Sequence, residues 1–273
     1  MKKYMLTTLL LLVCLWLGAT ETIHRTYELQ PFSYIEASFL YRIEVHKGNT
    51  YTMELEIPED LVNELTIAVS GNTLKLGVTK EWWRTTKNVF HKRYTITGRI
   101  TVPELEGITL SNAAVLVAKD GFMPANFQIK LSGASHAEVH VITHALNIDM
   151  TGASVLQMSG LATRTKAYVN GASSLNYYQE TNKMDLQALG ASYVVLSGTS
   201  VFTVIKASGG SKVRALDFET EEMTVKCQGA STAEIFVTGS LSATSLGASV
   251  IRVKGDPVYV KSSTKGASVI KTL

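Results

Sequence analysis

The sequence IKLSGASHAEV, residues 129–139, decides the fold because its central Gly-Ala-Ser returns at a nearly fixed interval. From Gly133 to Gly209 each step is 19 residues. Further copies of the tripeptide, with one Gly-Gly-Ser at Gly209, begin at Gly152, Gly171, Gly190, Gly229, Gly247 and Gly266. A weaker copy, Asn112-Ala113-Ala114, comes before them. Such a period indicates a stacked solenoid, in which each repeat buries its apolar face on its neighbours.

Apolar and polar residues alternate on both sides of the tripeptide. Ile129 and Leu131 flank Lys130 before the glycine, and Ala137 and Val139 flank a glutamate after it. A period of two is typical of strands with one buried face. Nineteen residues are too few for a pair of helices, and β-branched residues are frequent at the strand positions. The pattern therefore predicts an all-β parallel β-helix of ~19-residue coils.

Each predicted coil has two strands that meet at the Gly-Ala-Ser turn, and a less regular third side. Gly160, Gly198 and Gly255 are the candidate turn residues of that third side. Glycine suits the Gly-Ala-Ser turn because it accepts a positive φ and allows close approach of the next coil. We expect the stacked serines to be structural and not a row of ligand-binding hydroxyls.

The N-terminus has the pattern of a secretory signal peptide over residues 1–19. A basic start is followed by the apolar run Met5 to Leu17 and then by Gly18-Ala19. That run is too short for a comfortable membrane span, and no second one follows. Lipidation at Cys14 is disfavoured because large residues surround it. Residues 20–273 then form a single β-helix domain, in which 20–110 are opening coils or a cap and 111–273 are the regular coils.

The net charge and the cysteine count argue against nucleic-acid binding and against an internal disulfide. The chain holds 26 Lys and Arg against 23 Asp and Glu, so its net charge is +3. Removal of residues 1–19 takes away two lysines and no acid, which leaves about +1 and no general argument for binding nucleic acid. Only Cys227 then remains, and it fits an inward position of a strand.

The best candidate for a binding site is the basic and aromatic stretch 80–94. It contains five basic residues, one acid and four aromatics. Aromatic faces stack on sugar rings, and basic side chains contact anionic groups. The alternative is a hairpin excursion whose tryptophans pack on the solenoid wall or cap its end. The candidate ligand-binding residues are Trp82, Trp83, Arg84, Lys87, Lys92, Arg93 and Tyr94.

Two further clusters carry weaker signals for metal. His136, His140 and His144 lack the spacing of zinc proteases and a completing carboxylate or cysteine set. The acidic residues between 217 and 222 suit calcium oxygen chemistry, but a solvated turn is the favoured interpretation; they are Asp217, Glu219, Glu221 and Glu222. We therefore predict no metal site and no cofactor.

Outward-facing residues at equivalent positions of successive coils form rows that mix charges and amides. Such mixed rows disfavour catalysis. A carbohydrate-active β-helix enzyme would need converging carboxylates, for which Asp149 or Asp185 with Glu138 are the candidates. The sequence has no nucleophile elbow, P-loop or Rossmann glycine pattern. The enzyme remains one alternative. A module that assembles end to end through its C-terminal coil, as a homo-oligomer, is another.

Three motifs together resemble one known family. They are Ile100-Thr101-Val102-Pro103-Glu104-Leu105, Leu110-Ser111-Asn112-Ala113-Ala114 and Leu131-Ser132-Gly133-Ala134-Ser135. The chain is similar to the head GIN domain family, an auto-transporter adhesin domain of unknown function. The resemblance implies a right-handed parallel β-helix in the periplasm or on the surface of a Gram-negative bacterium. It also implies adhesion to a glycan or to an envelope or cell-surface protein, without catalytic residues.

Overall fold

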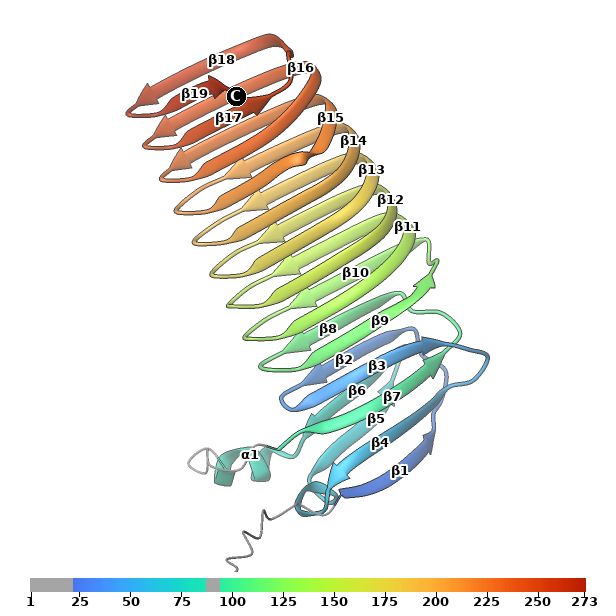
Figure 1. Cartoon of the computed structure of the whole chain (residues 1–273). Coiled ribbons are helices and arrows are strands. Elements are labelled where there is room, and N and C mark those ends of the chain that lie inside the picture. Colours follow the sequence, from blue (N-terminus) through green and yellow to red (C-terminus); the bar gives the residue numbers. More distant parts are fainter. Residues whose placement is uncertain (1–21, 87–93) are drawn as a thin grey trace, which may run out of the picture.

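The computed structural model describes residues 22–86 and 94–273, and they form a β-solenoid of about nine turns (Figure 1). The predicted all-β parallel β-helix is therefore confirmed. The strands of the stacked coils are β8 (Gly107–Ser111), β9 (Val115–Phe122), β10 (Asn126–Leu131), β11 (His136–Met150), β12 (Val155–Val169), β13 (Ser174–Ala188), β14 (Tyr193–Ala207), β15 (Lys212–Gly229), β16 (Thr232–Gly247), β17 (Val250–Lys254), β18 (Val258–Gly266) and β19 (Val269–Thr272).

The repeat interval equals the sequence separation between paired residues of neighbouring parallel strands. Ala137 of β11 lies opposite Leu156 of β12, and Leu156 lies opposite Leu175 of β13, so partners are 19 residues apart. Each inward side chain thus stacks on its counterpart in the next coil, and the core is continuous along the solenoid. The register shifts at β15, where the interval between Gly209 and Gly229 lengthens to 20.

Each coil bends at a single corner. This corner stands in the place where the sequence predicts a separate third side. Strands β11 to β14 each run for 15 residues without a break. Just after the corner of each, two consecutive residues face outward, such as Asn182 and Lys183 of β13. Gly160 and Gly198 have φ values of 124° and 118°, but both lie inside strands and not at turns. The prediction of a separate third side is wrong for these coils.

Buried hydroxyls hold the corner. The residue just before it is inward and small. Where it is a serine or threonine, its hydroxyl donates to the carbonyl two residues later, whereas in β12 it is Ala162. Thr181 Oγ1 donates to the Lys183 oxygen at 3.2 Å, and Ser200 Oγ donates to the Phe202 oxygen at 3.1 Å. A bend leaves backbone groups outside the regular ladder, so a side chain that satisfies them stabilises it. We call residues between a Gly-Ala-Ser turn and the corner the first wall, and those between the corner and the next turn the second wall.

The Gly-Ala-Ser turns stack along the opposite edge. Gly152 has a φ of 80°, and a Cβ there would lie 2.7 Å from the Gly133 oxygen, so both the conformation and the space require glycine. The serines of the turns from Ser135 to Ser249 are buried, and Ser154 Oγ lies 3.2 Å from Ser173 Oγ. Their structural interpretation is confirmed.

The described residues between 22 and 102 contain both opening coils and an antiparallel cap. Their elements are β1 (Thr22–Glu28), β2 (Tyr34–Ser38), β3 (Tyr41–Lys47), β4 (Thr52–Pro58), η1 (Glu59–Leu61), β5 (Leu65–Ser70), β6 (Thr73–Val78), α1 (Lys80–Thr86) and β7 (Ile96–Val102). Strands β2 and β3 pair in parallel with β8 and β9 and so continue the solenoid. Strand β4 pairs antiparallel with β1 and β7, and β5 with β6. The antiparallel strands cover the first coil, and Leu61 is fully buried beneath them.

Tyr177 and Cys227 are buried titratable groups of the core. Burial raises the pKa of Tyr177 to about 12, and its hydroxyl lies 2.7 Å from Thr165 Oγ1. Burial likewise raises the pKa of the Cys227 thiol to about 11. Both groups are therefore neutral in the folded protein at physiological pH.

Candidate functional site

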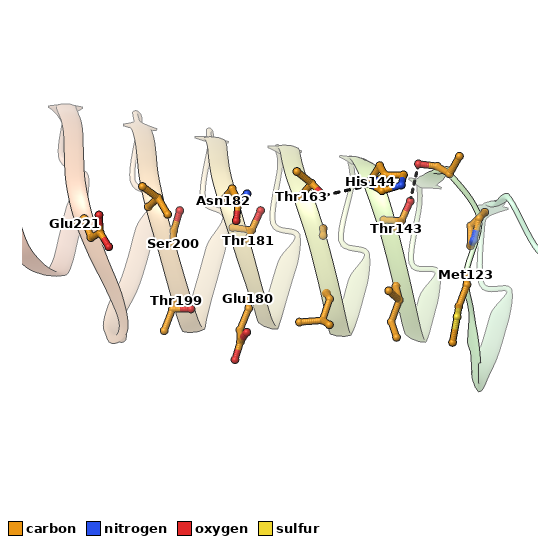
Figure 2. Close-up of a pocket in the computed structure, with 16 residues that line it drawn as sticks. Met123, Thr143, His144, Thr163, Glu180, Thr181, Asn182, Thr199, Ser200 and Glu221 are labelled. Carbon is orange, nitrogen blue, oxygen red and sulfur yellow. Dashed lines mark hydrogen bonds between the residues drawn. The ribbon is translucent and has the colours of Figure 1, made fainter.

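A groove of about 640 Å³ runs along the corner and crosses successive coils from Met123 to Glu221 (Figure 2). We call it the corner groove. Small buried residues of the position before the corner lie along its middle: Thr143, Ala162, Thr181 and Ser200. The preceding position supplies one bank: Ile142, Leu161, Glu180 and Thr199. The following position supplies the other bank: His144, Thr163, Asn182 and Val201.

The banks differ in chemistry along their length. Met123 and Leu161 are 62% and 44% exposed, so one stretch is apolar. Glu180 and Thr199 extend from the same bank farther along, and Asn182 and Thr163 face them from the other (Figure 2). Because coils stack about 4.8 Å apart, polar groups recur at that spacing. The corner groove therefore suits an extended ligand that crosses several coils and offers both apolar and hydrogen-bonding groups.

A second hollow of about 320 Å³ adjoins the corner groove on the first wall. We call it the tyrosine hollow. It shares Ile142, Leu161 and Glu180 with the corner groove and is also lined by His140, Ser159, Gly160, Tyr178, Gln179 and Gly198. Tyr178 is 71% exposed. Its partners in the adjacent coils are Ser159 and Ser197, so no large side chain stacks beside it.

The two hollows carry negative charge. Glu180 and Glu221 line them, together with His140 and His144. Of the described residues, no lysine or arginine lines either hollow. Positive residues such as Lys183 come after the corner and lie outside the lining. The site therefore disfavours an anionic ligand.

The described part of the stretch that the sequence favours, residues 80–86 and Tyr94, lies away from the corner groove. Helix α1 carries Trp82, which is half-buried against the core with its ring centroid 5.9 Å from that of Tyr94. Trp83 is 41% exposed, and its ring centroid is 4.5 Å from that of Phe39. Phe39 belongs to the first Gly-Ala-Ser-like turn and has a positive φ of 64°. In Figure 1, α1 lies on the side of these turns, away from the corner.

The seven predicted ligand-binding residues thus divide. Trp82 and Tyr94 pack together and onto the core, whereas Trp83 and Arg84 are exposed. Lys87, Lys92 and Arg93 lie outside the described residues. The assignment of a binding site to 80–94 stays a prediction, in which Trp83 and Arg84 are the residues most open to a ligand.

The candidate metal and catalytic residues do not assemble. His140 Nδ1 lies 2.9 Å from Ser159 Oγ, and His144 Nδ1 lies 3.5 Å from Thr163 Oγ1. Within 22–86 and 94–273, no group of three His, Cys, Asp or Glu side chains is placed to hold a metal ion. Glu138 is on the first wall, 2.8 Å from Lys119 Nζ. Asp149 and Asp185 line a hollow on the second wall, so neither converges with Glu138.

A larger hollow of about 750 Å³ lies where the cap meets the first coil. Its charged groups include both signs, and Glu56 among them has partners within the protein. His24 Nδ1 is 3.8 Å from Glu56 Oε1, and Thr97 Oγ1 donates to Glu56 Oε2 at 2.8 Å. This hollow is confined to the cap and the first coil, whereas the corner groove crosses several stacked coils, so for an extended ligand we favour the corner groove.

Sequence reasoning missed the corner groove, although one signal could have indicated it. Thr143, Thr181 and Ser200 are polar residues at inward positions, separated by multiples of 19. Two outward residues follow each one. A polar residue that breaks the apolar face at a constant place in the repeat indicates a bend, and a bend in stacked coils generates a continuous surface feature.

The comparisons with known proteins agree with this architecture. A family model described as "Putative auto-transporter adhesin, head GIN domain" matches residues 31–181 and 178–257. No curated protein matches the chain. Within the described residues, no helix is long and apolar enough to cross a membrane.

Several solved structures are similar over nearly their whole length. A "putative adhesin" from Parabacteroides merdae has a TM-score of 0.67 at 14% identity, with 94% of this chain and 98% of that chain covered. A "putative lipid binding protein" from Parabacteroides distasonis has a TM-score of 0.62 at 17% identity, with 92% and 96% covered. A "putative adhesin" from Bacteroides fragilis has a TM-score of 0.52 at 19% identity, with 93% and 98% covered. At these identities the likeness establishes the fold alone.

Proposed function

This chain belongs to the family described as "Putative auto-transporter adhesin, head GIN domain", and from that membership we propose that it is a non-enzymatic, adhesin-like binding module that holds an extended ligand in the corner groove. The family resemblance inferred from the sequence is thereby confirmed. The observation that carries the proposal is a continuous groove along stacked coils, with recurring polar groups and exposed apolar side chains.

Recognition in the corner groove must rely on side chains. Strands β12, β13 and β14 each pair with a strand on both sides, so their backbone groups are engaged in the ladder. A protein ligand that adds a strand needs a free sheet edge. A helical ligand needs a groove that is predominantly apolar, whereas Glu180, Asn182 and Thr163 line this one. These arguments favour a glycan over a protein.

The proposed cellular location follows from the same family membership. A family of adhesins acts outside the cytoplasm, on a surface. The signal peptide proposed for residues 1–19 would export the chain, and the periplasm and the cell surface are both consistent with it. Residues 1–21, including Cys14, lie outside the described residues. Cleavage near Ala19 is tested by N-terminal sequencing of the exported protein.

A non-enzymatic role has support from the walls of the solenoid. Asp149 and Asp185 lie on the second wall and Glu138 on the first, so neither aspartate faces a common groove with Glu138. The corner groove holds Glu180 and Glu221 on different coils. Incubation of the protein with each bound polysaccharide, followed by a reducing-end assay, should show no cleavage.

The proposed function is tested by a substitution that blocks the corner groove. Leu161→Arg places a long side chain on the bank between the apolar and polar stretches, and it should abolish binding of the full chain to a panel of glycans and surface proteins. Tyr168→Arg is the matched control, because Tyr168 is also outward and exposed but lies on the second wall. Thermal unfolding followed by circular dichroism should be the same for both variants.

The outcomes separate the two candidate surfaces. Loss of binding in Leu161→Arg and its retention in Tyr168→Arg support the corner groove. Retained binding in Leu161→Arg, together with loss in a Trp83→Ala, Arg84→Ala variant, would instead place the site in the stretch 80–94. Equal loss in Leu161→Arg and Tyr168→Arg would contradict both locations.

A second candidate function is end-to-end association into a homo-oligomer, and charge favours it. Residues 257–273 hold Lys261, Lys265 and Lys271 and no Asp or Glu. Strands β1 and β4 with residues 59–64 hold one arginine and six acids: Glu28, Glu54, Glu56, Glu59, Asp60 and Glu64. Opposite charge at the two ends favours head-to-tail contact.

The arrangement of the last coil adds to this argument. Among the described residues, β18 pairs only with β16, and β19 only with β17. Light scattering at high protein concentration should show association at low salt that a triple Lys→Gln variant at 261, 265 and 271 abolishes. A strict monomer at low salt would contradict this second function.

A further inference from the structure

We propose that the ligand of the corner groove is an uncharged glycan, and that Tyr178 is the residue on which one of its sugar rings stacks. This inference rests on the proposed function, because it names the ligand class of the same groove. It assigns the tyrosine hollow as the subsite where a single ring is held.

Tyr178 has the exposure that stacking requires. It is the most exposed aromatic side chain of the described residues, at 71%. Ser159 and Ser197 stack on either side of it in adjacent coils, and Gly160 and Gly198 follow them. Large side chains at positions 159 and 197 would cover the ring. An accessible aromatic face offers apolar area at low entropic cost, which suits the apolar face of a sugar.

Other exposed aromatic residues lack this combination. The Tyr193 hydroxyl accepts a bond from Arg214 Nη1 at 3.4 Å. Tyr168 lies in the polar hollow of the second wall. Neither lines the corner groove or the tyrosine hollow. Tyr178 therefore differs from them by its place beside a groove, not by its residue type.

The backbone beneath Tyr178 is held by the next residue. Gln179 is buried, and its Nε2 donates to the Ser159 oxygen at 3.1 Å and the Val141 oxygen at 3.4 Å. These bonds join the strand that carries Tyr178 to both preceding coils. A rigid support for a contact residue reduces the entropy lost on binding.

Polar partners for sugar hydroxyls lie beside the ring. Glu180 is two residues farther along the same strand, so it is on the same face as Tyr178, and it lines both hollows. Its carboxylate accepts hydrogen bonds. Asn182 and Thr163 on the opposite bank both donate and accept. A sugar carries several hydroxyls that also do both, and the spacing of the coils presents such partners repeatedly.

Charge selects among glycans. Glu180 and Glu221 line the hollows, and no lysine or arginine of the described residues does. A uronate or a sulfated sugar would bring negative charge beside these carboxylates without a cation to offset it. An uncharged glycan avoids that repulsion and still uses the hydrogen bonds and the stacking face.

The experiment measures binding of the full chain to an array of uncharged, anionic and amino-group-bearing glycans. At least one uncharged glycan should bind, and raising the salt from about 0.05 to about 0.5 M should change its affinity less than about twofold, because no ion pair is involved. Tyr178→Ala should weaken that binding about tenfold, as loss of a central aromatic contact does. Tyr178→Phe keeps the ring and should bind within about twofold of the parent.

Tyr168→Ala is the control, since it removes an exposed tyrosine from the other wall. Unchanged affinity in Tyr178→Ala, or binding to anionic glycans or proteins alone, would overturn the inference. In those cases loss of binding in Leu161→Arg would still support the groove as the site. If Leu161→Arg also bound normally, the proposed function itself would be wrong.

Discussion

Gly209 and Gly210 are adjacent in one turn but differ in backbone conformation. Replacing each with alanine tests why the turns of the solenoid begin with glycine. The copy at 209 reads Gly-Gly-Ser, whereas all seven exact copies have alanine in second place. Gly209 has a φ of +75°, and a Cβ on it would lie 2.7 Å from the Gly190 oxygen. The φ of Gly210 is not positive, and the same oxygen would be 3.9 Å from its Cβ. Gly209→Ala should destabilise the protein, and Gly210→Ala should not.

The expected changes in the free energy of unfolding follow from the environments of Gly209 and Gly210. An alanine in the left-handed conformation costs about 1–2 kcal/mol. Relieving the contact with Gly190 requires a backbone shift, which adds about 1–2 kcal/mol by analogy with overpacked cores. Gly209→Ala should therefore cost about 3 kcal/mol, and Gly210→Ala should gain about 0.4–1 kcal/mol by restricting the unfolded chain. For a domain of this size, these values correspond to a fall of about 6–12 °C and a rise of about 1–4 °C in Tm.

The assay is thermal unfolding of both variants and the parent, followed by circular dichroism at equal concentration and heating rate. Midpoints are compared, because a repeat protein need not unfold in a single two-state step. Midpoints of Gly209→Ala and Gly210→Ala within about 2 °C of each other would refute the argument from φ and close approach.

The remaining predictions concern the core and one ion pair. Because burial raises the pKa of Cys227 to about 11 from an ordinary value of 9.0, the folded state keeps the neutral thiol, and the stability it contributes should be lost as the pH rises from about 9 to about 11. The comparison is with Cys227→Ala in urea unfolding. Tyr177→Phe removes the hydroxyl 2.7 Å from Thr165 Oγ1, and it should lower the free energy of unfolding by about 1–2 kcal/mol. Glu234→Gln removes the carboxylate that contacts Arg252 at 2.7 Å, and it should cost about 1 kcal/mol at low salt and less at high salt.

Each of these has a distinct contrary result. A parent and a Cys227→Ala variant with parallel pH profiles would contradict the burial of the thiol. A Tyr177→Phe variant as stable as the parent would show that the bond to Thr165 contributes nothing. A salt-independent loss in Glu234→Gln would point to packing and not to charge. The thiol experiment is best made with Cys14→Ser, so that only one cysteine is present.

The sequence by itself determined the class of fold and the register of the stacked coils. In a parallel stack each residue lies on its counterpart one repeat later, so a 19-residue period in the sequence is the register itself, as Ala137 and Leu156 illustrate. Alternation around each Gly-Ala-Ser determined which side chains face inward. These features are local and repeated, and for that reason a single sequence displays them many times.

Only the tertiary structure decided where the coils bend and what that bend creates. The 15 residues of β13 contain no glycine or proline to mark the corner after Thr181. Its position is set by closure of the coil and by the buried hydroxyl bond to the Lys183 oxygen. The corner groove follows from that bend, repeated over stacked coils. Likewise, Trp82 and Trp83 are neighbours in sequence, but distant partners, Tyr94 for one and Phe39 for the other, settle how each is packed, because burial depends on what the rest of the chain places nearby.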